Sequence, residues 1–180
     1  MPMKIIYLTV LWYLLNNVDR CSTISYMITE RPVVSYVNET FAKYFILNSR
    51  RINHKDPRYY ANIYTETLMP LDNTIRMDFY FYEYLTNRYR PSFVELHFGF
   101  CDMLEKDSIF GSQIKRHREN LTCPYPPRQY NLTKMSVTFI PKNFPFQRGR
   151  IYLNITRHEI DKKALYVSAH IDMEIKNILS

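Results

Sequence analysis

The clearest pattern along the chain is a regular alternation of apolar and polar residues close to its C-terminus. From Leu165 to Ile175 every second side chain is apolar, and the residues between them are tyrosine, serine, histidine and two acids. A period of two is typical of a β-strand that packs one face on a core. We therefore expect a strand here, entered through a hairpin turn at Asp161–Lys163.

The same alternation predicts earlier strands. It is strong at Ile75–Leu85, where Met77, Phe79 and Phe81 share one face while Asp78 and three tyrosines share the other. A more weakly patterned strand is expected within Val33–Leu47, with Phe41, Phe45 and Leu47 on one face. The other expected strands are Tyr59–Met69, Pro91–Phe100, Met135–Phe139 and Ile151–Thr156.

One segment loses the two-residue period. Between Asp102 and Asn120 the apolar residues Phe110 and Ile114 stand four apart and are followed by a basic run. This spacing predicts a short amphipathic helix over Ile109–Arg118, with Ser108 placed to cap its first turn. The chain has 3 glycines, so we also expect few tight primed hairpin turns and longer loops.

These elements predict a mainly β fold, a two-sheet antiparallel sandwich with one short helix inserted between the fourth and fifth strands. Residues 26–180 have the size of one such domain. An immunoglobulin domain is the competing sandwich. It is disfavoured because the two cysteines are too close in sequence to bridge the sheets in the usual way, and because the one tryptophan, Trp12, precedes the domain.

The N-terminus has the pattern of a secretory signal peptide. A short positive start, Met1–Lys4, precedes an apolar run, Ile5–Leu15, that Asn16 and Asn17 end. A membrane anchor is the alternative, but it needs about 20 apolar residues and this run is shorter. We therefore expect residues 1–21 to be removed, with the cut between positions 21 and 25, and the protein to be secreted.

Secretion bears on two chemical modifications, a disulfide between cysteines and glycosylation of asparagines. Loss of Cys21 leaves Cys101 and Cys123, and an even pair in an oxidising compartment predicts a disulfide, with two buried thiols as the alternative. Four Asn-x-Thr sequons predict a glycosylated surface. Their acceptor residues are Asn38, Asn120, Asn131 and Asn154.

The sequence offers no catalytic constellation. Phosphate-binding loops and nucleophile elbows require closely spaced glycines, and the glycines of this sequence, at positions 99, 111 and 149, are too far apart to form either motif. The histidines have no metal-ligand spacing, and His97 and His170 fall on outward strand faces as ordinary solvated side chains. We expect no enzyme activity, no metal and no cofactor.

The chain carries a formal net charge of +7 and contains two basic clusters. Arg88-Tyr89-Arg90 and the run from Lys115 to Arg118 have the composition of nucleic-acid sites. In a secreted chain a solvated basic face, or attraction to an anionic membrane surface or acidic ligand, is the better interpretation. Nucleic acid is therefore not an expected partner.

An excess of aromatic residues, 16 Tyr and 11 Phe, lies largely in the expected strands. The inward-facing set packs solid if the two sheets meet closely. If the sheets splay apart, the same residues line an apolar cavity for a lipid or small hydrophobic molecule. The candidate lining consists of Phe79, Phe81, Leu96, Phe98, Phe100, Ile114 and Phe139.

The segment Tyr59–Lys176 resembles a known family. The motifs are Phe100-Cys101-Asp102-Met103-Leu104, a helix, Cys123-Pro124-Tyr125, Tyr130, Pro141 with Pro145, and Gly149-Arg150-Ile151-Tyr152-Leu153. They look like those of the insect secreted family of unknown function that includes the CheA and CheB chemosensory proteins. That family is similar to the ML lipid-recognition domains and the ganglioside activator protein, which are cup-shaped β-sandwiches.

The resemblance implies a secreted, non-enzymatic binder of lipids or hydrophobic signals such as pheromones or cuticular hydrocarbons, acting in chemosensory tissue. It carries over no catalytic residue. The alternative is an extracellular interaction domain with a solid core. In that case an outer stripe of Tyr80, Tyr82 and Tyr84 would contact a receptor or another partner.

Overall fold

The computed structural model describes residues 23–56, 58–107, 110–116, 122–136, 144–159 and 162–179. Within them the chain is mainly β, with two short helices, α2 (Phe100–Lys106) and α3 (Gly111–Arg116). The strands are β1 (Thr23–Val37), β2 (Ala42–Arg50), β3 (Tyr60–Thr67), β4 (Ile75–Leu85), β5 (Arg88–Gly99), β6 (Gln129–Met135), β7 (Arg148–Glu159) and β8 (Lys162–Leu179).

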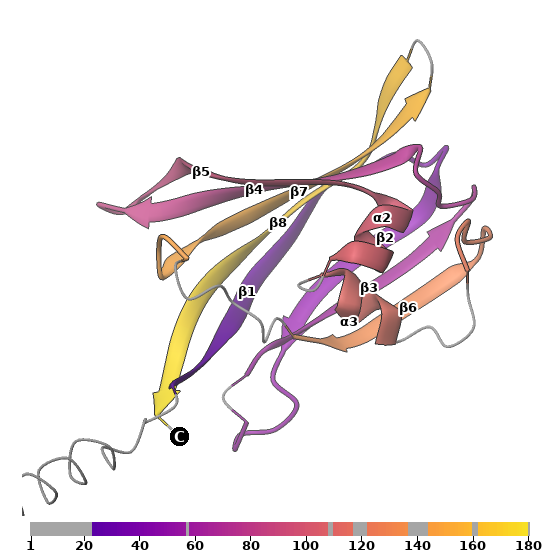
Figure 1. Ribbon diagram of the computed structural model, residues 1–180. Coiled ribbons are helices and arrows are strands. Elements are labelled where there is room, and N and C mark those ends of the chain that lie inside the picture. The colour runs from indigo at the N-terminus through magenta and orange to yellow at the C-terminus, as the bar shows by residue number, and fades with distance from the viewer. Residues whose placement is uncertain are drawn as a thin grey trace, which may run out of the picture.

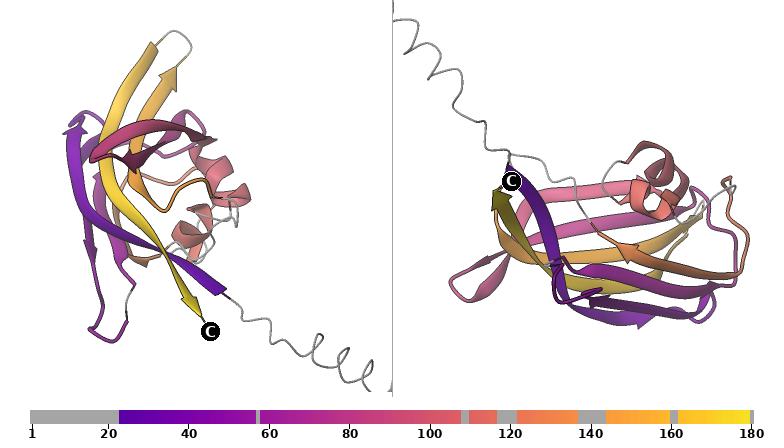
Figure 2. Two further views of the ribbon diagram at one scale, coloured as in Figure 1. Left: turned by 90° about the vertical axis from the view of Figure 1, so that its left-hand side faces the viewer. Right: turned by 90° about the horizontal axis from the view of Figure 1, so that it is seen from below.

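The strands form two antiparallel sheets, which confirms the predicted sandwich. The larger sheet has the order β1-β8-β7-β4-β5 and the smaller sheet the order β2-β3-β6. Figures 1 and 2 show the two sheets as separate layers, with α2 and α3 together at one side of the sandwich. The helices lie in the connection from edge strand β5 to edge strand β6, so they close the gap between those two edges.

The single strand expected within Val33–Leu47 is wrong: the chain forms two strands there, because β1 ends at Val37 and β2 of the smaller sheet begins at Ala42. β1 pairs along β8, but its register shifts between Glu30 and Val33 and again between Val34 and Tyr36. Arg31 has a positive φ of 48° at the first shift. Because these bulges interrupt the two-residue period, the sequence pattern is weak there. The additional strand places the helices after the fifth strand, not the fourth. The predicted signal peptide, residues 1–21, lies outside the described residues.

The helical segment also differs from the prediction of one helix over Ile109–Arg118. α2 begins at Phe100, where the sequence predicted the end of a strand, and the second helix spans Gly111–Arg116. The Asp107 carboxylate accepts hydrogen bonds from the backbone N–H groups of Phe110 and Gly111. Asp107 thus satisfies donors at the start of α3, while Ser108 lies outside the described residues.

The two helices contact each other at Gly111. A Cβ atom at this position would lie 1.9 Å from the backbone oxygen of Met103 in α2. No larger residue fits without moving one helix from the other. Met103 itself is fully buried, so this close approach fixes the helix pair against the core.

The turn between β4 and β5 is an exception to the expectation of longer loops. Thr86 and Asn87 alone separate the two strands, and both have positive φ, 46° and 62°. These values are those of a primed two-residue hairpin turn. Asparagine tolerates this backbone region better than most residues do, so the turn forms without glycine.

In the last strand a bulge changes which residues face inward. Ile155 pairs with Val167 and Thr156 pairs with Leu165, which leaves Tyr166 as the extra residue. Tyr166 is 3% exposed, whereas Leu165 is 37% exposed. The predicted assignment of Leu165 to the core face and Tyr166 to the outer face is therefore wrong at this end of β8.

The expected strand Met135–Phe139 is displaced toward the N-terminus. β6 ends at Met135, and its inward residues are Tyr130 and Leu132, which are 3% and 7% exposed. Lys134 has a positive φ of 57°, which breaks the alternation near the strand end. Val137 and Phe139 lie outside the described residues.

The predicted disulfide joins Cys101, near the start of α2, to Cys123 in the segment before β6, with a Cα–Cα distance of 5.9 Å. Two residues beyond Cys123, Tyr125 exchanges backbone hydrogen bonds of 2.9 Å with Leu71. The bond thus ties the helix pair to a segment that is anchored on the loop between β3 and β4.

Removing this disulfide by the double substitution Cys101→Ala and Cys123→Ala should destabilise the fold. The two residues are 22 apart, and opening a loop of that size lowers the free energy of unfolding by about 3 kcal/mol. Urea denaturation of the variant would measure this loss. Reductant should destabilise the wild-type protein similarly and leave the variant unaffected; an unchanged midpoint in the variant would contradict the prediction.

Candidate functional site: an apolar chamber between the sheets

Two adjoining cavities lie between the sheets, with volumes of about 130 Å³ and about 60 Å³. Ile63, Met77, Ile114 and Leu153 line both of them. These residues come from β3, β4, α3 and β7, so both sheets and one helix contribute to the boundary that the two cavities share. We call the two cavities together the interior chamber.

The larger part of the chamber has an almost wholly apolar lining. It is walled by the inward faces of both sheets and by the helical segment on one side. Beyond the four shared residues, its lining is Met27, Thr29, Leu47, Tyr59, Ala61, Phe79, Phe110, Gln113, Met135, Ser136, Ile151, Ala169, His170 and Ile171.

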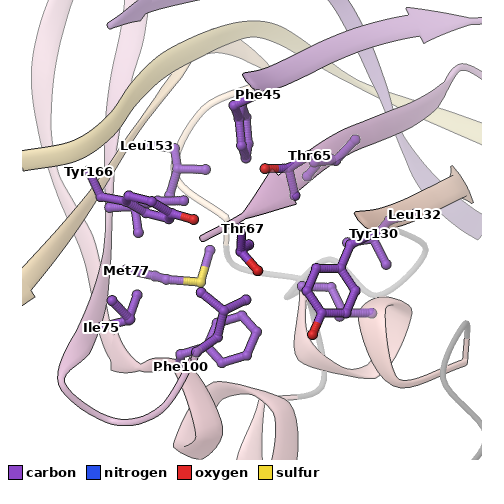
Figure 3. A pocket seen from close by; sticks show the side chains of 14 residues that line it. Phe45, Thr65, Thr67, Ile75, Met77, Phe100, Tyr130, Leu132, Leu153 and Tyr166 are labelled. Carbon is purple, nitrogen blue, oxygen red and sulfur yellow. The ribbon is translucent and has the colours of Figure 1, made fainter. Parts of the chain in front are cut away.

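The smaller part adjoins the larger one at the four shared residues and is shown in Figure 3. Here the lining includes two threonines from β3 and two tyrosines, together with apolar side chains. Beyond the shared residues, the lining is Phe45, Thr65, Thr67, Leu71, Ile75, Phe100, Tyr130, Leu132, Ile155 and Tyr166.

Stacked rings position the helical wall of the chamber. The rings of Phe79 in β4 and Phe110, immediately before α3, lie 4.4 Å apart and within 3° of parallel. Phe79 also meets Phe98 of β5 edge-on at 6.4 Å. Four residues after Phe110, Ile114 projects from the same helical segment and reaches both cavities.

Neither lining contains Asp, Glu, Lys or Arg among the described residues. His170 belongs to the lining of the larger part, but its ring lies 5.2 Å from that of Tyr152 on the outer face. Burial and the nearby Arg150 charge lower the pKa of His170, which favours the neutral imidazole. The chamber is therefore an uncharged environment.

The hydroxyl groups of the smaller part differ in their hydrogen bonding. Thr65 Oγ1 donates to the Tyr44 carbonyl at 2.8 Å, and the Tyr130 hydroxyl donates to the Pro126 carbonyl. Among the described residues the buried Tyr166 hydroxyl has no partner. Burial, reinforced by Tyr130, raises the pKa of the Tyr166 phenol, so it stays protonated.

The predicted lining residues fall into three groups. Phe79, Phe100 and Ile114 line the chamber. Phe81 is buried but packs edge-on against Phe144 at 5.7 Å, away from the lining. Leu96 and Phe98 are partly buried against the core, because β5 is the edge of the larger sheet. Phe139 lies outside the described residues.

Sequence reasoning missed much of the chamber wall. Met27 and Thr29 belong to a strand whose bulges obscure its period, and Tyr166 turns inward because of the β8 bulge. Tyr130 is the second residue of β6, a strand that was expected to begin only at Met135. A signal was present at Ala61 and Ile63, because they stand two apart in the expected strand Tyr59–Met69 and therefore share one of its faces.

The outer face of the larger sheet carries a separate polar network. His97 Nδ1 lies 2.8 Å from Asp78 Oδ1, its Nε2 lies 3.3 Å from Glu95 Oε2, and its ring meets Tyr80 edge-on. The hydrogen bond with Asp78 is the main cause that raises the pKa of His97. Within the described ranges no group of three or more His, Cys, Asp or Glu residues is arranged to hold a metal ion.

Farther along the same face, aromatic rings and arginines are interleaved. Tyr82 packs on Tyr152 at 4.7 Å, and Tyr84 packs on Tyr89 at 4.9 Å. The guanidinium of Arg148 lies 4.5 Å above the ring of Tyr84. The guanidinium of Arg150 lies 4.1 Å above Tyr89 and donates to Asp172 Oδ1 at 2.7 Å. We call these seven residues, with Tyr80, the outer aromatic face.

The sequons and basic clusters are placed at the surface where described. Asn131 is exposed on edge strand β6, Asn38 follows β1, and Asn154 lies on β7 with its Oδ1 accepting from the Ser168 hydroxyl at 2.9 Å. Arg88 and Arg90 are exposed beside the β4–β5 turn, as are Lys115 and Arg116 at the end of α3. Asn120, His117 and Arg118 lie outside the described residues.

The fold and the chamber together define a two-sheet β-sandwich with an apolar interior space. Residues 75–153, less than half of the chain, match the model of a family described as "Protein of unknown function (DUF1091)". The matched segment runs from β4 into β7 and includes both helices and both bridged cysteines. No curated protein matches the sequence.

The length and hydropathy of the helices also bear on whether a helix could cross a membrane. Neither of those in the described ranges has the length and apolar character that crossing a bilayer requires.

The His97 network should make stability depend on pH. Because its folded pKa is raised above the ordinary 6.5, its contribution is full below about pH 6.5 and is lost as pH rises through the raised pKa. We expect His97→Gln to lower the free energy of unfolding more at about pH 6 than at about pH 9. Solvent screening of a side chain that is 41% exposed limits the effect to below about 1 kcal/mol.

Urea denaturation at both pH values measures this difference. His54→Gln, at an exposed loop position, is the matched control and should cost little at either pH. An equal loss at both pH values in His97→Gln would show that protonation is not involved.

Proposed function

We propose that this protein is a secreted, non-enzymatic binder that holds a lipid or another small hydrophobic molecule in the interior chamber. The observation that carries this proposal is the chamber itself, an uncharged apolar space walled by both sheets and the helix pair. Its larger part, about 130 Å³, is close to an engineered apolar cavity of about 150 Å³ that stays dry and binds benzene. The adjoining cavity extends the space for a longer ligand.

The proposed role in secretion and signalling rests on the sequence. The N-terminal pattern, the sequons and the cysteine pair favour an extracellular protein, and the bridge between Cys101 and Cys123 agrees with an oxidising compartment. The likeness to the CheA and CheB chemosensory family and to ML lipid-recognition domains favours a pheromone or cuticular hydrocarbon as ligand. A neutral, chain-like molecule of that kind suits the apolar lining.

The test is a displacement assay combined with a substitution that fills the chamber. Ala169 is fully buried on β8 and lines the larger part, so Ala169→Leu adds bulk where the ligand would lie. We expect it to weaken binding of the fluorescent apolar probe N-phenylnaphthylamine by about tenfold, because overpacking typically costs 1–3 kcal/mol. Native mass spectrometry of protein secreted by cultured eukaryotic cells should also detect a bound apolar molecule in the wild type.

A matched control lies on the same strand. Ala164 is outside both cavity linings, so Ala164→Leu should leave probe binding unchanged. If Ala169→Leu is not secreted, Ile171→Phe supplies the same test from a half-buried lining position. Wild-type protein that binds neither the probe nor any apolar compound would refute the proposal.

A second candidate function is supported by the outer aromatic face. Tyrosine rings that pack on one another at a tilt and lie under two arginines form an ordered surface, and aromatic residues with arginine are enriched where proteins bind partners. In this case a receptor or an anionic membrane surface would contact the larger sheet. Tyr84→Ser would then abolish binding of the labelled protein to responsive cells while leaving probe displacement intact.

A further inference from the structure

The hydroxyl of Tyr166 is a hydrogen-bonding group inside a mostly apolar wall. Tyr166 is 3% exposed and lines the smaller part of the chamber. Figure 3 shows its ring reaching from β8 among the other lining side chains, with the hydroxyl oxygen at the inner end. Within the described residues this oxygen has no hydrogen-bond partner.

An unpaired buried hydroxyl is unfavourable, because the group loses its bonds to water and gains none from the protein. Its neighbours are placed differently: Thr65 donates to the Tyr44 carbonyl, and Thr67 Oγ1 lies 3.4 Å from the Arg128 carbonyl that accepts from it. The Tyr130 hydroxyl is likewise satisfied by Pro126. Among the four hydroxyl groups that line the smaller part, Tyr166 is therefore the one that remains available to a ligand.

The β8 bulge is what brings this hydroxyl inside. Without the extra residue between the Leu165 and Val167 pairings, the alternation would place Tyr166 on the outer face. The bulge is a local departure from regular strand pairing that points a polar side chain toward an apolar cavity. Bulges often redirect a side chain in this way next to a binding site.

We propose that the chamber selects an uncharged hydrophobic molecule with one oxygen acceptor, such as an ester, ketone or aldehyde, whose oxygen accepts a hydrogen bond from Tyr166. This inference rests on the proposed function and names its ligand class. The phenol can donate because burial keeps it protonated. The hydrocarbon part then extends past Met77 and Leu153, which line both cavities, into the larger part.

A fatty-acid anion fits this lining poorly. No lysine or arginine among the described residues lines either cavity, so a buried carboxylate beside Tyr166 would accept from its hydroxyl but meet no opposite charge. Burying a charge without a partner is far more costly than burying a neutral carbonyl. The chamber should therefore prefer an ester to the acid of the same chain.

The experiment compares three competitors for displacement of N-phenylnaphthylamine from the full-length secreted protein at neutral pH. They are methyl decanoate, decanoate and dodecane. Dodecane has the same chain length as the ester and is supplied through the vapour phase. We expect the wild type to bind the ester at least about a hundredfold more tightly than the carboxylate. Tyr166→Phe should weaken ester binding by about five- to tenfold and leave dodecane binding unchanged, since it removes the donor alone.

Tyr130→Phe is the matched control. Tyr130 lines the same part of the chamber, but its hydroxyl donates to the Pro126 carbonyl, so its loss should not change the ratio of ester to dodecane affinity. Tyr166→Phe is expected to fold, because it removes a hydroxyl without a partner. Its thermal midpoint should not fall below that of the wild type.

The outcomes separate this inference from the proposed function. Equal losses for ester and dodecane in Tyr166→Phe, or the same selective loss in Tyr130→Phe, would overturn the hydrogen bond while leaving an apolar binding protein. Decanoate competing as strongly as its ester would overturn the uncharged ligand class. A wild type that binds none of the three, nor the probe, would overturn the proposed function itself.

Discussion

The structure depends on two sheets of unequal width being joined along one side by the helix pair. The larger sheet ends at β5 and the smaller at β6, and α2 and α3 connect these edges. Contact of Phe110 with Phe79 fixes the helical segment to the larger sheet, and the bridge from Cys101 to Cys123 fixes it to the chain that leads into β6. The apolar faces are therefore covered by three walls, which meet around a space.

The two faces of the larger sheet divide the chemistry of the protein. Inside, the described residues of the lining include no Asp, Glu, Lys or Arg, and burial lowers the pKa of the histidine that belongs to it, His170. Outside, Asp78, His97 and Arg150 form charged hydrogen bonds, and arginines lie on tyrosine rings. Strand alternation produces this division, because neighbouring residues of β4 and β7 point to opposite faces. A ligand inside and a partner outside could therefore be bound without sharing a residue.

The sequence predicted the regular parts of this fold and missed the irregular ones. The period of two located β4, β5, β7 and β8, and the cysteine count located the disulfide. Bulges cannot be placed in this way, since they depend on which residue of the partner strand is opposite. That is why β1 was underestimated and why Tyr166 was assigned to the wrong face.

The candidate site shows the same limit. Phe79 and Ile114 were predicted as lining residues because one lies on a regular inward strand face and the other on a helix, whereas Phe100 was predicted at the end of a strand and lines the chamber from the start of α2. Phe98 shares the inward pattern but belongs to the edge strand, and its exclusion follows from strand order, which periodicity does not give. The Thr86–Asn87 turn shows that composition is also an indirect guide, because asparagine supplied a backbone conformation that was expected of glycine.

The space between the sheets is itself an energetic argument for a ligand. At about 24 cal/mol per Å³, the value found for cavities that large-to-small substitutions leave in a core, a sealed empty space of about 130 Å³ would cost about 3 kcal/mol, which is similar to what the disulfide contributes. Larger side chains at Ala61 and Ala169, which face the larger part from opposite sheets, would reduce this loss. A buried hydroxyl without a partner adds to it at Tyr166. A bound molecule that fills the space and accepts from that hydroxyl would remove both costs at once.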